Sequence, residues 1–159
     1  MVCSARLFCL SLILFLGLGL APAGPAAADP AATAFALSQG SEAPLNALRR
    51  QAGSAPLAPD PQLAAAAADH AAWMHSTGQT GHAGRGGLRS YERALAAGYC
   101  PAAIAENIAW GQASLQAALS TWAGSGGHRR NMVNRIFTRY GLARAEGYWV
   151  LILGGACVG

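Results

Sequence analysis

The chain has 159 residues, of which 53% are hydrophobic and 11% are charged, a length and composition that exclude a multidomain assembly and a wholly disordered chain. All 11 basic residues are arginines, which against seven acidic residues give a net charge of +4. Arg6 lies in a segment that we expect to be removed, so the mature charge is 10 − 7 = +3, too modest to favour nucleic acid as a partner.

Residues 1–28 have the pattern of a secretion signal. Arg6 precedes an apolar run over 7–20, and small residues 26–28 follow a proline-containing break. As a helix the run would span about 21 Å, less than the ~30 Å of a bilayer core. We therefore expect cleavage after Ala28 and a secreted or periplasmic mature chain with no transmembrane segment. An uncleaved membrane anchor is the alternative.

After a short lead-in, the first half of the mature chain is predicted to be mainly helical. Residues 29–40 are rich in alanine, serine and glycine with little periodicity, and we interpret them as a linker. Asp60 followed by Pro61 is a strong helix start, and Ser114 is a second capping residue. Helices are predicted over 41–51, 60–76, 90–97 and 114–123.

The remaining elements differ in kind. Residues 104–110 are a short apolar segment, a strand or an extended stretch, and a short helix is predicted to open near Ser125. Residues 140–145 and 148–153 alternate as two strands of a hairpin with a Glu-Gly turn. Helices first and strands last indicate an α+β fold, in one domain over 41–159.

Two of the four cysteines, Cys3 and Cys9, fall in the signal segment, which leaves Cys100 and Cys157. An exported chain meets an oxidising compartment, so we expect these two to form a disulfide. Two separate buried thiols are the alternative. A catalytic cysteine is not favoured, because nothing nearby would lower a thiol pKa.

The histidines fall into two pairs. His70 and His75 lie five residues apart on one predicted helix and so face different directions, which argues against a shared metal. We expect His70 to be a hydrogen-bonded core residue and His75 to lie on the surface. His82 lies in a glycine-flanked loop and His128 follows two glycines, so both rings have little steric cover.

Glu106 is an acid within a mainly apolar segment. Burying a carboxylate without a partner is costly, so it requires a cation, a metal or a histidine nearby. Spacing alone leaves two readings open: a site shared by His82, Glu106 and His128, or three unrelated polar residues.

The segment Ala105-Glu106-Asn107-Ile108-Ala109-Trp110-Gly111 is followed by Trp122, Ser125, Gly127-His128-Arg129 and Asn131-Met132. This pattern resembles the signature of the CAP superfamily, the SCP/PR-1-like domains that include cysteine-rich secretory proteins, and above all its small bacterial branch. The resemblance covers about residues 43 to 154.

The resemblance implies a three-layer α-β-α sandwich with a small antiparallel sheet. It also implies a cavity lined by two histidines and two glutamates. His82 and His128 match the histidines and Glu106 matches the first glutamate, whereas Ser125 stands where the second glutamate is usual.

The function that the resemblance and the residues suggest together is binding of a divalent cation, with zinc expected, by His82 and His128. Glu106 is then a candidate base or an orienting residue. Whether the chain is an enzyme stays open. The alternatives are a metal-assisted hydrolase of peptide or cell-wall amide bonds, and a lipid- or sterol-binding protein. A Ser125–His128–Glu106 relay is a poorer possibility, because no oxyanion hole is evident.

The expected partner is a small molecule, a lipid or a cell-envelope component. Five arginines late in the chain form either a basic face for anionic surfaces or, as we favour, an ordinary solvated surface: Arg129, Arg130, Arg135, Arg139 and Arg144.

Overall fold

The structure of the protein is a computed structural model that describes residues 29–157. The predicted signal segment and its cleavage after Ala28 lie outside these residues. The elements in chain order are α1 (Pro30–Gly40), α2 (Glu42–Gln51), β1 (Ala58–Pro59), α3 (Pro61–Thr77), α4 (Ser90–Ala96), β2 (Ile104–Trp110), α5 (Leu115–Gly124), α6 (Gly126–Val133), β3 (Phe137–Ala145) and β4 (Tyr148–Gly155).

The strands form one sheet in the order β1-β3-β4-β2. The predicted hairpin is confirmed, since β3 and β4 pair antiparallel and Glu146 adopts the positive φ of 50° that the turn needs. β2 adds to the other side of β4, also antiparallel. The expectation of an antiparallel sheet needs one correction, because β1 pairs parallel with β3. With two residues, β1 is too short to leave a periodic signal.

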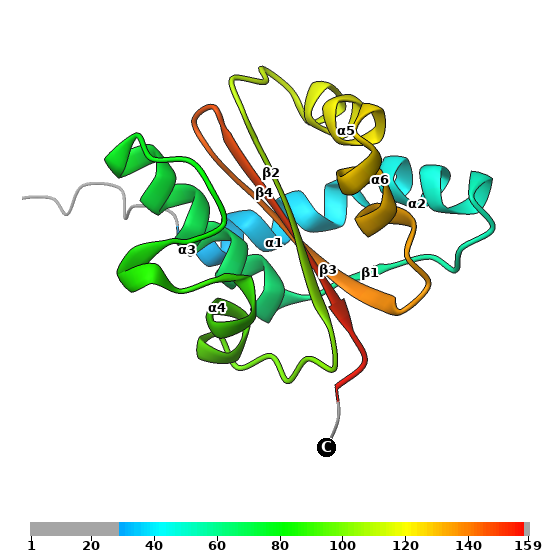
Figure 1. Ribbon diagram of the computed structural model, residues 1–159, viewed down its shortest axis with the longest axis horizontal. Coiled ribbons are helices and arrows are strands. Elements are labelled where there is room, and N and C mark those ends of the chain that lie inside the picture. The colour runs from blue at the N-terminus through cyan, green and yellow to red at the C-terminus, as the bar shows by residue number, and fades with distance from the viewer. Residues whose placement is uncertain (1–28, 158–159) are drawn as a thin grey trace, which may run out of the picture.

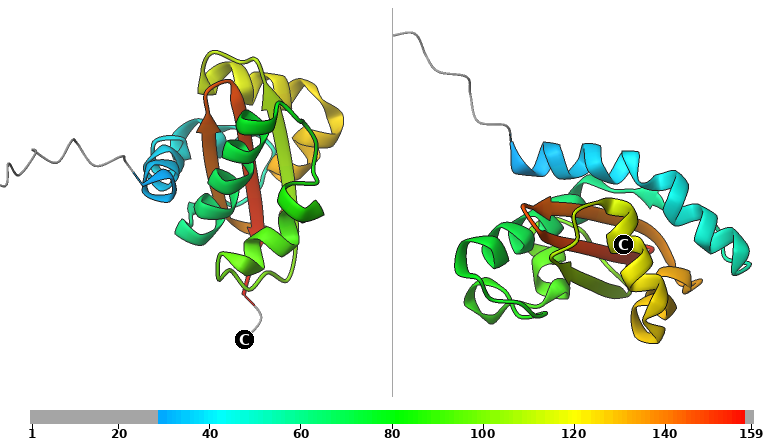
Figure 2. Two further views of the ribbon diagram at one scale, coloured as in Figure 1. Left: turned by 90° about the vertical axis from the view of Figure 1, so that its left-hand side faces the viewer. Right: turned by 90° about the horizontal axis from the view of Figure 1, so that it is seen from above.

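Helices cover both faces of the sheet, which makes the predicted three-layer sandwich. α3 and α4 pack on one face, and α2, α5 and α6 pack on the other (Figure 1). α1 lies along the edge of β3 and contributes Ala34 to the first core and Leu37 to the second. Side chains on a strand alternate between faces, so β4 sends Val150 and Ile152 into the first core and Leu151 and Leu153 into the second. Figure 2 shows α1 nearest to β3, with β2 at the far side of the sheet.

Capping residues explain where the best-predicted helices begin. The Asp60 side chain accepts hydrogen bonds from the backbone N–H groups of Gln62 and Leu63, and Pro61 occupies the first turn of α3. Ser114 caps α5 in the same way, accepting from Ala117 N–H. Both starts agree with the sequence prediction.

The predicted linker over 29–40 is wrong, because these residues form α1. Asp29 caps the helix by accepting from the N–H of Ala31. Ser38 then ties it to the sheet: its hydroxyl lies 2.7 Å from Leu142 N and accepts that N–H. The helix has no marked amphipathic period, so its stability comes from these contacts with β3 and α3.

The predicted disulfide is present near the C-terminus. Cys100, which precedes β2, is bonded to Cys157, which follows β4, with an S–S distance of 2.01 Å and a sequence separation of 57. The bond joins the ends of the two paired strands. In the described part of the chain, no helix combines the length and apolar character that a membrane span requires.

Candidate functional site

Glu106 is the centre of the site. It lies on β2, its side chain is 2% exposed, and both of its oxygens are engaged. Oε1 accepts a hydrogen bond from Nδ1 of His82 at 2.8 Å. Oε2 accepts from the guanidinium of Arg93. The prediction that this carboxylate requires a cation or a histidine is confirmed, and it has one of each.

His82 reaches Glu106 from the loop between α3 and α4. The preceding residue, Gly81, has a φ of 133°, which L side chains rarely adopt, so glycine is needed where the chain turns. The backbone oxygen of His82 accepts from Arg93 at 3.2 Å. Since the His82 side chain is 48% exposed, one end of the ring is held on the carboxylate while much of the rest faces solvent.

Arg93 is the site residue that sequence reasoning missed. It lies on α4 with its side chain 2% exposed, and it also donates to the carbonyl of Leu88. Its charge offsets that of Glu106, which would otherwise be buried alone. Two features of the sequence could have identified it. Glu106 in an apolar segment requires a cation, and Arg93 lies on a predicted helix beside the small apolar residues Ala94 and Ala97.

His128 lies in the first turn of α6, and its backbone is held from the other face of β2. Asn107, next to Glu106 and fully buried, points to this face because strand side chains alternate. Its Nδ2 donates to the backbone oxygen of His128 at 3.0 Å, and its Oδ1 accepts from Nδ2 of Asn131 at 2.9 Å. Adjacent residues of one strand therefore hold the two histidine-bearing segments.

The ring of His128 is half-buried and its environment favours the neutral form. Its Nδ1 is buried without a hydrogen-bond partner among the described residues. Burial lowers the pKa of His128, and the nearby His82 lowers it further. A neutral imidazole is the form that binds metals.

Of the other residues that the sequence singles out, two histidines lie as predicted and Ser125 takes no part in the predicted relay. His70 is a buried, hydrogen-bonded core residue and His75 is exposed, both as predicted. Ser125 caps α6 by position, without a side-chain capping bond. Among the described residues, no hydrogen bond joins Ser125 to His128 or His128 to Glu106, so the relay through these three has no support.

The donor set is small for a metal. Within residues 29–157, no three His, Cys, Asp or Glu side chains are grouped so that they could hold one ion together. The imidazoles of His82 and His128 are the nitrogen donors that remain beside β2, and both oxygens of Glu106 already accept hydrogen bonds.

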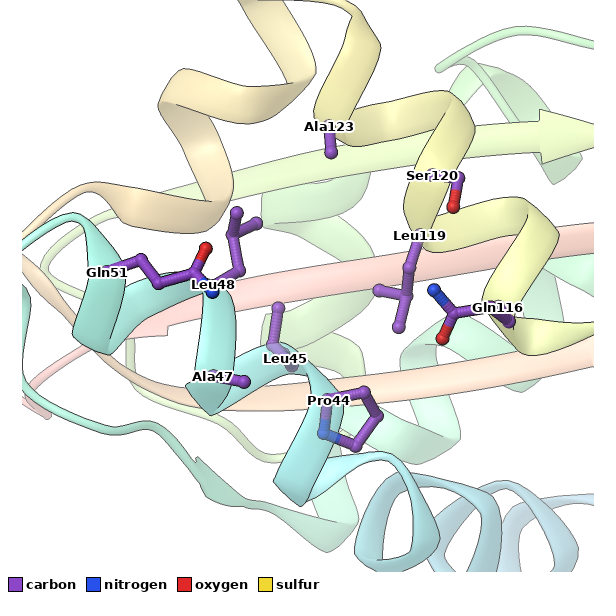
Figure 3. Close-up of a pocket in the computed structure, with 9 residues that line it drawn as sticks. All are labelled: Pro44, Leu45, Ala47, Leu48, Gln51, Gln116, Leu119, Ser120 and Ala123. Carbon is purple, nitrogen blue, oxygen red and sulfur yellow. The ribbon is translucent and has the colours of Figure 1, made fainter.

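A separate groove lies on the other helix layer, between α2 and α5. It encloses about 200 Å³ and is lined mainly by apolar side chains, among them Leu45, Leu48 and Leu119 (Figure 3). None of the predicted site residues lines it.

Comparisons with known proteins agree with this fold. An extracellular protein containing an SCP domain from Bacillus anthracis superposes with a TM-score of 0.70 at 23% identity, over 86% of this chain and 45% of that one. An outer surface protein from Borrelia burgdorferi gives 0.68 at 18% identity, over 74% and 90%. A cysteine-rich secretory protein from Staphylococcus aureus gives 0.63 at 18% identity, over 75% and 38%. This chain thus spans less than half of the first and third proteins.

Identities this low establish the fold alone, and no curated protein matches the chain. The sequence pattern of one family, the cysteine-rich secretory protein family, matches residues 43–152, which include α3, all of β2 and β3, and every residue of the site described above. The chain therefore belongs to the cysteine-rich secretory protein (CAP) family.

Proposed function

We propose that this protein is an exported CAP-family domain that binds a divalent cation, zinc in the first instance, between His82 and His128. The observation that carries the proposal is the hydrogen bond from His82 Nδ1 to Glu106. A carboxylate only accepts, so Nδ1 carries a proton, and in the neutral ring Nε2 then has the lone pair for a ligand. Histidines that bind metals are oriented in this way by a carboxylate or carbonyl partner.

The second imidazole supports the same proposal. Burial lowers the pKa of His128, so its ring is neutral at pH 7 and able to ligate. Two neutral ligands are fewer than the three of typical catalytic zinc sites, and water would complete the coordination. We therefore expect affinity well below that of a structural zinc site.

Glu106 acts in this proposal as an orienting group. Both of its oxygens are hydrogen-bonded, one to His82 and one to Arg93, and the side chain is 2% exposed, so a bound water would have to compete with these partners to pass it a proton. This arrangement counts against the hydrolase alternative, which requires a base at this position.

Export is supported by three separate observations. The signal pattern of residues 1–28 is one, and the Cys100–Cys157 disulfide, which suits an oxidising compartment, is another. The third is that similar folds occur in an extracellular protein and an outer surface protein. Mass measurement of the protein secreted by its host should give a chain that begins at Asp29. A chain that retains Met1 would contradict export by cleavage.

The cation is tested by calorimetric titration of the metal-free protein with zinc. Binding should be abolished in His82→Ala and His128→Ala and unchanged in His75→Ala, which removes an exposed histidine of α3. Glu106→Gln should bind about 10–100-fold more weakly, since the ring of His82 loses its anionic partner. Equal heats in the wild type and in the two site variants would reject the proposal.

A further inference from the structure

His70 is fully buried on α3, yet it contacts the segment that carries His82. Its Nε2 lies 2.8 Å from the backbone oxygen of Gly81, the residue before His82. A carbonyl oxygen only accepts, so the hydrogen of this bond is on Nε2. The neutral ring then has its unprotonated nitrogen at Nδ1.

That second nitrogen packs against the other end of the same segment. A Cβ placed on Gly84 would lie 2.7 Å from Nδ1 of His70, closer than real Cβ contacts occur. The Nδ1 atom is buried and has no hydrogen-bond partner among the described residues. One imidazole therefore touches both glycines that flank His82-Ala83, by a hydrogen bond at Gly81 and by close packing at Gly84.

The ring of His70 is itself held in place. Trp73, one turn later on α3, stacks on it with a centroid distance of 5.6 Å and an interplanar angle of 11°. Burial and the charge of Arg93 both lower the pKa of His70, which keeps the ring neutral. The ring thus has one orientation and one protonation state in which to hold the loop.

We propose that His70 is a positioning residue for His82, which fixes the backbone from Gly81 to Gly84 so that His82 Nδ1 remains on Glu106. Among the described residues, the other side-chain hydrogen bonds to this loop involve Arg93 and Glu106. Arg93 donates to the backbone oxygens of His82 and Leu88, and Glu106 accepts from the ring of His82. His70 supplies the hold on the side facing α3. The inference goes beyond the proposed function, because none of its readouts involves a cation.

The test measures the tautomer of His82 by the nitrogen NMR shifts of its ring in metal-free protein. In the wild type the shifts should report a proton fixed on Nδ1. In His70→Ala they should move toward the mixed tautomers of a free imidazole. The amide of Gly84, which donates to Leu88 O at 2.8 Å, should exchange with solvent at least about tenfold faster. His70→Gln, whose side-chain amide can donate to Gly81 O, should restore much of both signals.

Three further variants separate positioning from a general loss of stability. Leu63→Ala removes a fully buried side chain from the far end of α3, beside Gly154, and should leave the His82 shifts unchanged at a comparable loss of stability. Gly84→Ala keeps His70 but displaces its ring, so it should reproduce the shift change, while Gly124→Ala, which adds its methyl group in open space, should not.

Unchanged His82 shifts in both His70→Ala and Gly84→Ala would overturn the inference, and so would an equal change in Leu63→Ala. If His70→Ala does not fold, Gly84→Ala alone decides the question. Failure of zinc to bind the wild type would remove the proposed function and leave this inference intact.

Discussion

Arg93 and Glu106 form an ion pair in which each side chain is 2% exposed. The pair joins α4 to β2, and through His82 it also joins the loop that precedes α4. Two buried charges that neutralise each other are tolerated, whereas either one alone is costly. The site is therefore coupled to the stability of the layer formed by α3 and α4.

Removing one partner of this pair should strongly lower the free energy of unfolding. Arg93→Met should lower the free energy of unfolding by about 3–5 kcal/mol, because Glu106 remains buried without its cation. Urea denaturation measures the change. Adding Glu106→Gln to this variant should recover part of the loss. The control is Arg85→Met, whose 69% exposed side chain lies 4.0 Å from Asp69 and should cost less than about 1 kcal/mol. Equal losses in the two arginine variants would contradict the prediction.

Much of the fold was predictable because its signals are local. Asp60 with Pro61 and Ser114 cap helices that the sequence places correctly, and the Glu-Gly turn identifies the hairpin of β3 and β4. α1 was missed because an alanine-rich segment without periodicity becomes a helix here through contacts such as that between Ser38 and Leu142, which are distant in sequence.

The site was predictable in part for the same reason. A carboxylate in an apolar strand indicates that a partner exists, but not which arginine supplies the charge. Arg93 was missed because its pairing with Glu106 depends on how α4 docks on β2. In the sequence, Asn107 stands out only as part of a motif. Its hydrogen bond to the His128 backbone follows from the alternation of side chains on β2 once the positions of the helix layers are known.

The disulfide should contribute strongly to stability. With a separation of 57 residues, chain entropy predicts a loss of about 4 kcal/mol when Cys100→Ser and Cys157→Ser are combined. The measurement is urea denaturation, with the reduced wild-type protein as the matched control, which should lose a similar amount. A loss under about 1 kcal/mol would indicate that the bond barely restricts the unfolded chain.

Tyr140 should make the protein sensitive to alkali. Its hydroxyl donates to Ser38 O and lies 3.2 Å from Ser41 Oγ, and burial raises its pKa from 10.0 to about 12. The folded chain holds this proton more tightly than the unfolded chain. The resulting stability, of order 2–3 kcal/mol, is complete below pH 10 and is lost as the pH rises toward about 12.

Denaturation at a series of pH values, with tyrosinate absorbance followed in parallel, measures this effect. Tyr140→Phe cannot ionise, so its stability should fall less steeply over the same interval. Tyr99, whose pKa burial also raises, remains in both proteins and accounts for part of the residual slope. Parallel pH profiles for the wild type and Tyr140→Phe would contradict this assignment.

Gly141 marks a very close approach between β3 and α3. A Cβ at this position of β3 would lie 2.1 Å from Ala64 N and 2.1 Å from the carbonyl carbon of Leu63, both backbone atoms of α3. Backbone atoms cannot rotate away as a side chain can, so the whole helix would have to move. Gly141→Ala should therefore lower the free energy of unfolding by at least about 3 kcal/mol, the upper end of the usual cost of overpacking.

Gly124→Ala, with nothing within 4 Å of the added methyl group, should leave the stability unchanged or raise it by up to about 1 kcal/mol. Comparable urea midpoints for the two variants would mean that α3 can shift on the sheet at little cost, and the close packing of Leu63 and Ala64 on β3 would then not be what fixes its position.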